Sequence, residues 1–382
     1  MNQLDPKIRT YLEEIKRKPE RVFDLERKIR ESVATWLIGL DTPIQVLART
    51  VFTSIPYIDK ISGINRLGQP QVLFSSGTGM GKTAMAQSLA LSLDAKSTRI
   101  QGEPTLMPYD ITGSERLVET LEGKRLVVFE PGPIFAHVVL FDEASRAHPK
   151  GKAAIMEGGE ELSVTCKKDF ICEDGITERT LPLFPLSGRY DDFDSPRFFM
   201  VLFTQNPIEE EDAAYPDPKG QVDRITLRIP LNYPGRNVEK QIKACNVVGK
   251  KITPVSDLYE ILACAQYIYD NIRESENASA YRSDLINNTR PEEVQGSPGF
   301  VEYVKKHVLK GVSPRAHFHL EGMARTWAFF SGDSLIKPEH VKAVAPLVLT
   351  HRVFLTPAVL YSKTPEAVFE EILQNTPMPR WE

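Results

Sequence analysis

The sequence has few of the residues that mark a disulfide-rich or zinc-binding protein. Of its 382 residues, four are cysteine and seven are histidine. No cysteines form a Cys-x-x-Cys pair and the histidines show no ligand spacing, so neither disulfides nor zinc is expected. No apolar run reaches the roughly 18 residues of a membrane-spanning helix. The N-terminus is too charged for a signal peptide, so a cytoplasmic protein is expected.

There is also little excess charge of either sign. Lys and Arg number 47 and Asp and Glu 51, which gives a net charge of −4. This balance excludes an overall electrostatic footprint for nucleic acid or anionic lipid, although a local basic patch remains open. The chain exceeds the roughly 250–300 residues at which single hydrophobic cores stop growing, so we expect two domains.

Residues 1–36 predict an N-terminal helical arm. Apolar residues recur at helical spacing from Leu4 to Ile15, and a second helical stretch follows Pro19. We expect this arm to pack on the core. A helix that binds a partner is the alternative.

Residues 37–234 alternate short apolar runs with helical patterns, which predicts an α/β core. The runs are apolar at successive positions, as in strands of a parallel sheet that helices cover on both faces. The expected strands are 72–74, 138–141 and 198–203, and a helix is expected at 84–93. Residues 163–197 interrupt this rhythm and predict an extended hairpin around Glu173-Asp174-Gly175.

Residues 235–382 predict a helical C-terminal domain. The expected helices are 236–246, 255–273, 300–309, 314–331 and 337–349. Between them, residues 274–299 are polar and contain Pro291, Gly296 and Pro298, so a long loop is expected there.

Residues 75–83 predict a phosphate-binding loop. Ser-Ser-Gly-Thr-Gly-Met-Gly-Lys-Thr follows an expected strand and opens an expected helix, which is the context of a P-loop. Glycines let backbone N–H groups face phosphate oxygens, and the helix N-terminus adds partial positive charge. Lys82 would contact the β- and γ-phosphates of ATP, and the Thr83 hydroxyl would hold Mg²⁺. The remaining nucleotide contacts expected from the loop are Gly77, Thr78, Gly79, Met80, Gly81 and Ala84.

The apolar run at 138–141 ends in two carboxylates, Asp142 and Glu143. Such a pair alone is compatible with a solvated strand end. After a P-loop it is better read as a Walker B motif, in which Asp142 orients the Mg²⁺ shell and Glu143 polarises the attacking water. Ligands of open α/β sheets bind at this carboxyl end of the strands.

Several further blocks follow in a characteristic order. They are Asp-Ile-Thr-Gly-Ser-Glu (110–115), Pro-Gly-Pro-Ile-Phe-Ala (131–136), Asp-Glu-Ala-Ser-Arg-Ala (142–147), Thr-Gln-Asn-Pro-Ile-Glu (204–209), Tyr-Pro (215–216), Gln-Val-Asp-Arg (221–224) and Gly-Val-Ser-Pro-Arg-Ala (311–316). With these blocks, the segment from Ile38 to about Arg352 resembles the MoxR family of AAA+ ATPases. The resemblance implies an AAA+ P-loop core, with a parallel sheet sandwiched by helices, and a helical C-terminal lid. It also implies a hairpin insert at about 111–135.

The resemblance implies further site residues. Asn206 looks like sensor 1, which positions the lytic water; the alternative is an Asn that makes a turn before Pro207. Arg224 stands where the family has its arginine finger, which acts on nucleotide held by the neighbouring subunit. Its alternative role is a salt bridge with Asp223.

Four more residues have counterparts in the family or lie near its motifs. Arg315, at the start of a lid helix, looks like sensor 2, which reaches the phosphates. Ile38 and Gly39 resemble the backbone edge that flanks the adenine. Arg146 could contact phosphate or an interface, and a surface ion pair is an equal alternative.

Some positions depart from the family pattern. Ser76 stands where the strict P-loop has Gly, Glu130 where Arg is common, and Ser145 where the family has Asn. These departures spare Lys82 and the acidic pair, so they bear on the substrate or partner rather than on ATP chemistry.

The resemblance implies an ATPase that uses ATP and Mg²⁺ in a homo-oligomeric, hexameric ring. Its activity would be chaperone-like remodelling or maturation of a client protein, with a von Willebrand factor A-domain protein as a possible partner. Three alternatives remain open: a nucleotide-dependent scaffold with negligible turnover, a metal-chelatase-type motor, and a nucleic-acid-associated motor. The acidic run at 209–212 argues against the last of these.

Overall fold

The structure is a computed structural model that describes most of the chain. The described residues are 4–59, 63–77, 79–119, 125–165, 170–171, 177–178, 183–185, 195–205, 219–244, 250–360 and 362–379. Thr78, Asn206 and the Glu173-Asp174-Gly175 turn lie outside these ranges.

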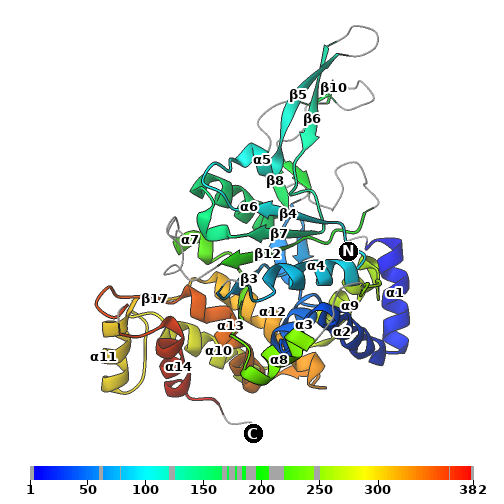
Figure 1. The fold of residues 1–382 in the computed structure, drawn as a ribbon. Coiled ribbons are helices and arrows are strands. Elements are labelled where there is room, and N and C mark those ends of the chain that lie inside the picture. Colours follow the sequence, from blue (N-terminus) through cyan, green and yellow to red (C-terminus); the bar gives the residue numbers. More distant parts are fainter. Residues whose placement is uncertain are drawn as a thin grey trace.

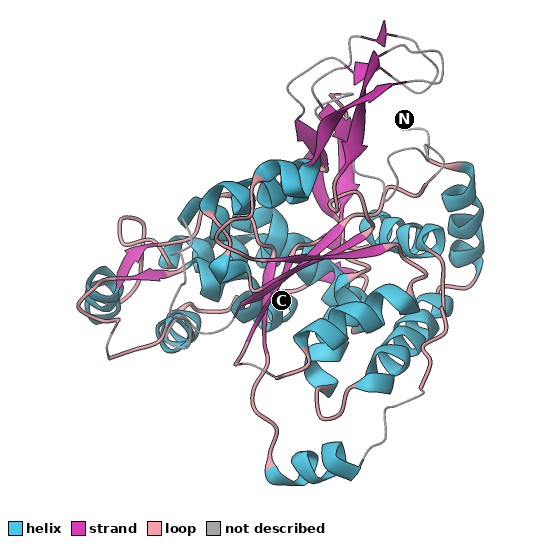
Figure 2. Ribbon diagram, turned by 45° about the horizontal axis from the view of Figure 1, so that its top comes forward, coloured by secondary structure: helices cyan, strands magenta, loops and turns pink. Residues whose placement is uncertain are grey.

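A five-stranded parallel sheet forms the centre of the molecule (Figure 2). The strands follow the order β13 (Leu227–Pro230), β3 (Val72–Ser75), β12 (Met200–Gln205), β7 (Val138–Asp142) and β4 (Ser97–Gln101). All four neighbouring pairs are parallel. The expectation that the three apolar runs form buried parallel strands is confirmed by β3, β7 and β12.

Helices cover both faces of this sheet. The helices of this part of the chain are α3 (Asp41–Thr50), α4 (Lys82–Ser92), α5 (Pro108–Thr112), α6 (Pro149–Glu161) and α7 (Lys219–Val222). Successive strand residues point to opposite faces, so Val72 joins the core that contains Leu89 of α4. Its neighbour Leu73 joins a second core that contains Ile155 of α6. The predicted α/β core with a sandwiched parallel sheet is therefore confirmed.

Because all five strands are parallel, the sheet has two chemically different ends. We call the end where the strands finish the carboxyl edge, and the end where they begin the amino edge. At the carboxyl edge, β3 ends at Ser75, β7 at Asp142 and β12 at Gln205. At the amino edge, Val72 of β3 pairs with Leu227 of β13. The four residues of β3 separate these edges by roughly 10 Å, because a strand rises about 3.3 Å per residue.

Antiparallel hairpins project from the core, away from the C-terminal helices (Figure 1). The longest pairs β5 (Gly113–Glu119) with β6 (Arg125–Pro131) within the segment 111–135. Shorter pairs join β8 (Ser163–Thr165) to β11 (Leu183–Pro185) and β9 (Phe170–Ile171) to β10 (Thr177–Glu178). A further pair, β1 (Ile55–Ile58) with β2 (Asn65–Gly68), does not share this direction, because β1 contacts one of the C-terminal helices.

The N-terminal arm consists of α1 (Pro6–Arg17) and α2 (Glu20–Val33). The Tyr11 hydroxyl of α1 donates to Asp257 Oδ2 at 2.6 Å, beside the start of α9. Phe23 of α2 stacks on Phe329 with ring centroids 4.9 Å apart. The arm thus packs against the C-terminal helices as well as against α3 and α4 of the core.

The C-terminal part is helical, with a few short strand pairs. Its helices are α8 (Arg236–Ala244), α9 (Leu258–Asn271), α10 (Glu276–Asn288), α11 (Pro298–His307), α12 (Arg315–Phe330), α13 (Pro338–Leu349) and α14 (Pro365–Asn375). The strand pairs are β14 (Arg273–Glu274) with β16 (Leu335–Ile336) and β15 (Val308–Lys310) with β17 (Phe354–Leu355). None of the described helices is both long and apolar enough to span a bilayer.

The expected loop at 274–299 is wrong over its first half, where the structure has α10. Ser275 caps this helix by accepting a hydrogen bond from the Ala278 amide, and Tyr281 and Leu285 are fully buried. Polar residues on the solvent side of α10 lower its average hydropathy, whereas its apolar residues keep helical spacing. Burial of that face stabilises the helix despite the polar composition.

Candidate nucleotide-binding site

The phosphate-binding loop has the local structure that the sequence predicts. The chain leaves β3 at Ser75 and enters α4 at Lys82. Gly79 and Gly81 have φ of 77° and 79°, a left-handed conformation that favours glycine. Lys82 is 8% exposed, and its ammonium donates to the Ser76 carbonyl oxygen at 2.9 Å, so the charge lies inside the curve of the loop.

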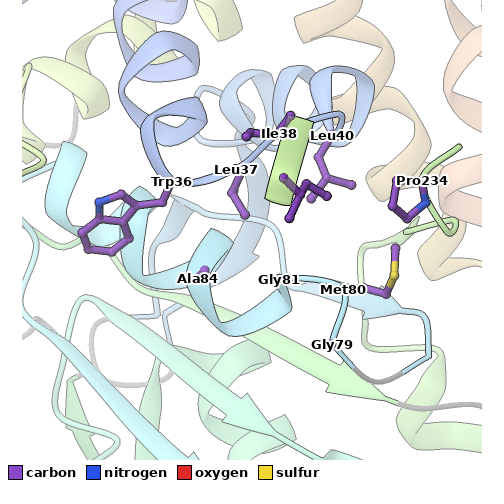
Figure 3. Close-up of a pocket in the computed structure, with 10 residues that line it drawn as sticks. Trp36, Leu37, Ile38, Leu40, Gly79, Met80, Gly81, Ala84 and Pro234 are labelled. Carbon is purple, nitrogen blue, oxygen red and sulfur yellow. The ribbon is translucent and has the colours of Figure 1, made fainter. Parts of the chain in front are cut away.

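A cavity of about 240 Å³ lies directly beside this loop (Figure 3). Its walls are mostly apolar and come from three segments: Trp36, Leu37, Ile38 and Leu40 before the sheet, Gly79, Met80, Gly81 and Ala84 of the loop and α4, and Pro234 and Ile242 near α8. Gly39 has a φ of 75° and packs under Val238, where a Cβ atom would lie 2.2 Å from Val238 Cγ1. An apolar, partly open cavity next to a phosphate loop suits the base and ribose of a nucleotide.

The first carboxylate of the acidic pair lies at the carboxyl edge beside α4. The Asp142 side chain is 9% exposed, and its Oδ2 accepts from the Thr83 hydroxyl at 3.2 Å. The same Oδ2 accepts from Arg99 Nη2 at 2.6 Å, and Oδ1 accepts from the Thr204 hydroxyl at 2.5 Å. The strands β4, β7 and β12 and helix α4 therefore converge on this single carboxylate.

Glu143 follows in a left-handed conformation with φ of 52°, which is uncommon for a residue with a side chain. Its amide donates to the Thr204 hydroxyl at 2.9 Å, which holds the backbone in place. Its Oε2 accepts from Gln101 Nε2 at 2.9 Å and from Arg146 Nη1 at 3.0 Å. Of the roles weighed for Arg146, an ion pair is what the structure shows, and its partner is Glu143.

The residues that would hold Mg²⁺ fit that ion. A hydroxyl and a carboxylate oxygen lie 3.2 Å apart at Thr83 and Asp142, and Mg²⁺ prefers such hard oxygen ligands. The described residues contain no cluster of three or more His, Cys, Asp or Glu that would form an all-protein cage.

Arg224 and Arg315 lie at the amino edge of the sheet, opposite the phosphate loop. Arg224 precedes β13, and its Nε pairs with Glu160 Oε2 at 2.7 Å. Arg315, the first residue of α12, pairs with the other oxygen of Glu160, and its Nη1 lies 3.7 Å from Asp223 Oδ2. The structure thus brings the two arginines together on one carboxylate and brings neither to Lys82. Arg224 pairs with Glu160 rather than with Asp223.

A third arginine, Arg352, is buried at the amino edge of the sheet. Arg352 is 1% exposed and donates through Nη2 to the Ile225 carbonyl oxygen at 2.5 Å and to His319 Nδ1. Burial lowers the pKa of Arg352 to about 10. Burial, together with the neighbouring Arg352 charge, holds the pKa of His319 well below its usual value. His319 is therefore neutral and can accept this hydrogen bond.

Several site residues were not singled out from the sequence, among them Arg99, Gln101 and Glu160. Arg99 and Gln101 lie on alternate positions at the end of β4, next to β7 in the sheet. The sequence could have indicated these two residues, because a parallel strand that ends beside the acidic pair brings its last residues close to those carboxylates. Glu160 carries no comparable signal, because it lies within α6 and its partners are 64 and 155 residues away in the sequence.

Comparisons with known proteins agree with the fold and the phosphate loop. Residues 71–173 match the family described as "ATPase family associated with various cellular activities (AAA)", and residues 303–372 match the AAA lid domain. A crystal structure of a protein from Cytophaga hutchinsonii superimposes with a TM-score of 0.72 at 25% identity, over 96% of this chain and 99% of that chain.

Curated relatives carry the family name. The chain is 30% identical to Chaperone MoxR1 of Mycobacterium tuberculosis, over 83% of this chain and 76% of the relative. It is also 30% identical to the uncharacterized protein YeaC of Bacillus subtilis, over 82% of this chain and 87% of the relative. Protein MoxR of Paracoccus denitrificans is 26% identical over 77% of this chain. With the phosphate loop, the acidic pair and the lid helices on one AAA+ fold, these matches show that the chain belongs to the MoxR family of AAA+ ATPases.

Proposed function

We propose that this chain hydrolyses ATP to ADP and phosphate in a homo-oligomeric ring and couples hydrolysis to the remodelling or maturation of a client protein. The observation that carries the proposal is the division of charged groups between the two edges of the sheet. Lys82, Thr83, Asp142 and Glu143 lie at the carboxyl edge, whereas Arg224 and Arg315 lie at the amino edge.

In this proposal the carboxyl edge binds the nucleotide. Gly77 to Ala84 surround the phosphates, Ile38 and Gly39 flank the adenine, and Lys82 pairs with the β- and γ-phosphates. Thr83 and Asp142 would hold Mg²⁺, which when bound would supply positive charge beside the phosphates. Glu143 orients and deprotonates the attacking water, and Asn206 would help position it.

The amino edge completes the site of a second copy. A guanidinium contributes to phosphoryl transfer when it contacts the γ-phosphate, and Arg224 cannot reach its own loop across roughly 10 Å of strand. We therefore assign Arg224 to the nucleotide of the neighbouring subunit. Arg315 shares the carboxylate of Glu160 with it and is assigned to the same neighbour. Hydrolysis then depends on assembly.

The relatives support a chaperone-like role, because one of them is named a chaperone. A client protein, a von Willebrand factor A-domain partner, a ring of six subunits and a cytoplasmic location are parts of the proposal that follow from the family. The hairpin of β5 and β6 projects from the core and is a suitable element to contact a client (Figure 1).

A nucleotide-dependent scaffold with negligible turnover is the second candidate. One observation favours it: Glu143 Oε2 accepts hydrogen bonds from both Gln101 and Arg146, so protein donors hold this oxygen in this state. An attacking water would have to use Oε1 or displace one of these donors.

Steady-state ATP hydrolysis against protein concentration separates the two candidates. For an assembly-dependent ATPase, we expect turnover per subunit to rise with concentration and to vanish in Glu143→Gln. A flat, near-zero rate in both proteins, with ATP still bound, would support the scaffold and contradict the ATPase.

A further inference from the structure

Arg99 contacts the same oxygen of Asp142 as Thr83 does. Its guanidinium donates twice to Asp142 Oδ2, from Nε at 3.0 Å and from Nη2 at 2.6 Å. This oxygen is also the acceptor of the Thr83 hydroxyl. Because Thr83 and Asp142 are the residues assigned to Mg²⁺, the guanidinium neutralises the same oxygen that the ion would.

Arg99 also connects the two carboxylates of the acidic pair. Its Nη2 donates to Gln101 Oε1 at 2.8 Å, and Gln101 Nε2 donates to Glu143 Oε2 at 2.9 Å. Arg99 and Gln101 therefore form one continuous chain of hydrogen bonds from Asp142 to Glu143. A displacement of the guanidinium removes a donor from Asp142 and a donor from Gln101, the residue that holds Glu143.

The guanidinium has room to leave Asp142. The Arg99 side chain is 52% exposed, and Arg99 lines a cavity of about 150 Å³ between α4 and the strands β4 and β7. A half-exposed ion pair is a weak contact, typically within about 1 kcal/mol of neutral. A divalent ion that arrives with ATP carries twice the charge of the guanidinium and favours the same oxygen.

We propose that Arg99 is a positioning residue that competes with Mg²⁺ for Asp142 and so links metal binding to the position of Glu143. Before the metal binds, Arg99 neutralises Asp142 and keeps Gln101 on Glu143. When the metal binds, the guanidinium leaves Oδ2, and the hydrogen bonds that reach Glu143 through Gln101 rearrange. This inference rests on the proposed function, because it takes Asp142 as the carboxylate of the metal shell.

Mg²⁺ titration of nucleotide binding tests the proposal without any measurement of turnover. The probe is a fluorescent ATP analogue, and the readout is the free Mg²⁺ that half-saturates the Mg²⁺-dependent change in its binding. Arg99→Met removes the charge and keeps an unbranched stem, so we expect this concentration to fall by about threefold, the size of an exposed ion pair. Arg99→Lys, which keeps one donor and the charge, should lie between Arg99→Met and the native protein.

The control variant is Arg116→Met. Arg116 is also an exposed strand arginine in an ion pair, with Glu130 at 3.3 Å, but it lies on the hairpin. Its Mg²⁺ half-saturation should equal that of the native protein. Arg99→Lys keeps the test available if Arg99→Met fails to fold.

Two results would overturn the role of Arg99. An unchanged Mg²⁺ half-saturation in Arg99→Met would mean that the ion does not compete with the guanidinium. A large loss of nucleotide affinity in the presence of EDTA would mean that Arg99 binds phosphate instead. A wrong assignment of the metal site gives a different result from a wrong role for Arg99. If Asp142 does not hold Mg²⁺, Asp142→Asn would leave the Mg²⁺ dependence of nucleotide binding unchanged, with or without a substitution at Arg99.

Discussion

The two edges of the central sheet differ in how their charged residues are held. At the carboxyl edge, Lys82 is buried in its loop and Asp142 receives hydrogen bonds from three elements. At the amino edge, Arg224 and Arg315 remain 32% and 42% exposed and share one partly exposed carboxylate. Buried groups with several partners keep one position, whereas exposed ion pairs exchange partners readily.

This difference suits two different tasks. A pocket that binds nucleotide within one subunit benefits from residues that are already in place. Arginines that must reach a ligand on another subunit need a partner that they can leave, and Glu160 is such a partner. The comparison therefore predicts that variants at the carboxyl edge affect the subunit that carries them, and variants at the amino edge affect its neighbour.

The largest effect on nucleotide affinity is expected at Lys82. Lys82→Ala removes the charge that pairs with the phosphates, and the loss of a hydrogen bond to a charged group lowers affinity by about 100-fold. Equilibrium binding of a fluorescent ATP analogue measures this effect. Lys342→Ala, an exposed lysine of α13, is the control and should bind normally. Tight ATP binding by Lys82→Ala would contradict the assignment of the loop.

The largest effect on turnover, as distinct from affinity, is expected at Arg224. Arg224→Ala should bind ATP normally and lose turnover by about 10³-fold, the size reported for arginine fingers. Mixing with Glu143→Gln subunits should restore turnover, because these cannot hydrolyse ATP but still carry Arg224. The double variant Glu143→Gln with Arg224→Ala is the control donor and should restore nothing.

The same mixing assay tests whether Arg315, like Arg224, acts on the nucleotide of a neighbouring subunit. If Arg315 serves the neighbouring subunit, Glu143→Gln subunits should also restore the turnover of Arg315→Ala, which we expect to fall by about 10- to 100-fold. If Arg315 served its own nucleotide, no such donor would help. Rescue of Arg224→Ala without rescue of Arg315→Ala would therefore separate the two arginines that the structure brings together.

The carboxyl edge was largely predictable from the sequence for a physical reason. Lys82 and Thr83 follow β3 after one short loop, and Asp142 and Glu143 lie at and just after the end of β7. Because parallel strands end at one edge, local patterns were sufficient to bring these residues together. The fold class was predictable on the same grounds, since strands buried on two faces give continuous apolar runs.

The amino edge was not predictable in the same way. Glu160 belongs to α6 of the core and Arg315 to α12 of the lid, and their ion pair depends on how the two parts dock. No local spacing encodes that docking. The helix α10 was missed for a related reason, because burial against α12 and α13 stabilises it more than its own composition does. Both cases depend on tertiary packing.

The smallest effect is expected in the pH dependence of folding stability, which His319 beside Arg352 would cause. The folded-state pKa of His319 lies well below its unfolded value near 6.5, so the neutral form is favoured in the fold. Below about pH 6.5 the unfolded chain takes up a proton that the folded chain does not, and stability falls by up to about 1.4 kcal/mol per pH unit. Above that pH the penalty is absent.

Denaturant unfolding at pH 7.5 and pH 5.5 measures this loss. His319→Gln keeps a carbonyl acceptor for Arg352 and cannot titrate, so its stability should fall less between the two pH values, by about 1 kcal/mol. The comparison at pH 7.5 controls for the packing cost of the substitution itself. An equal pH dependence in both proteins would mean that His319 is protonated in the fold. The amino edge would then carry a further positive charge beside Arg352 and Arg315, and its contact with the phosphates of a neighbour would weaken as pH rises.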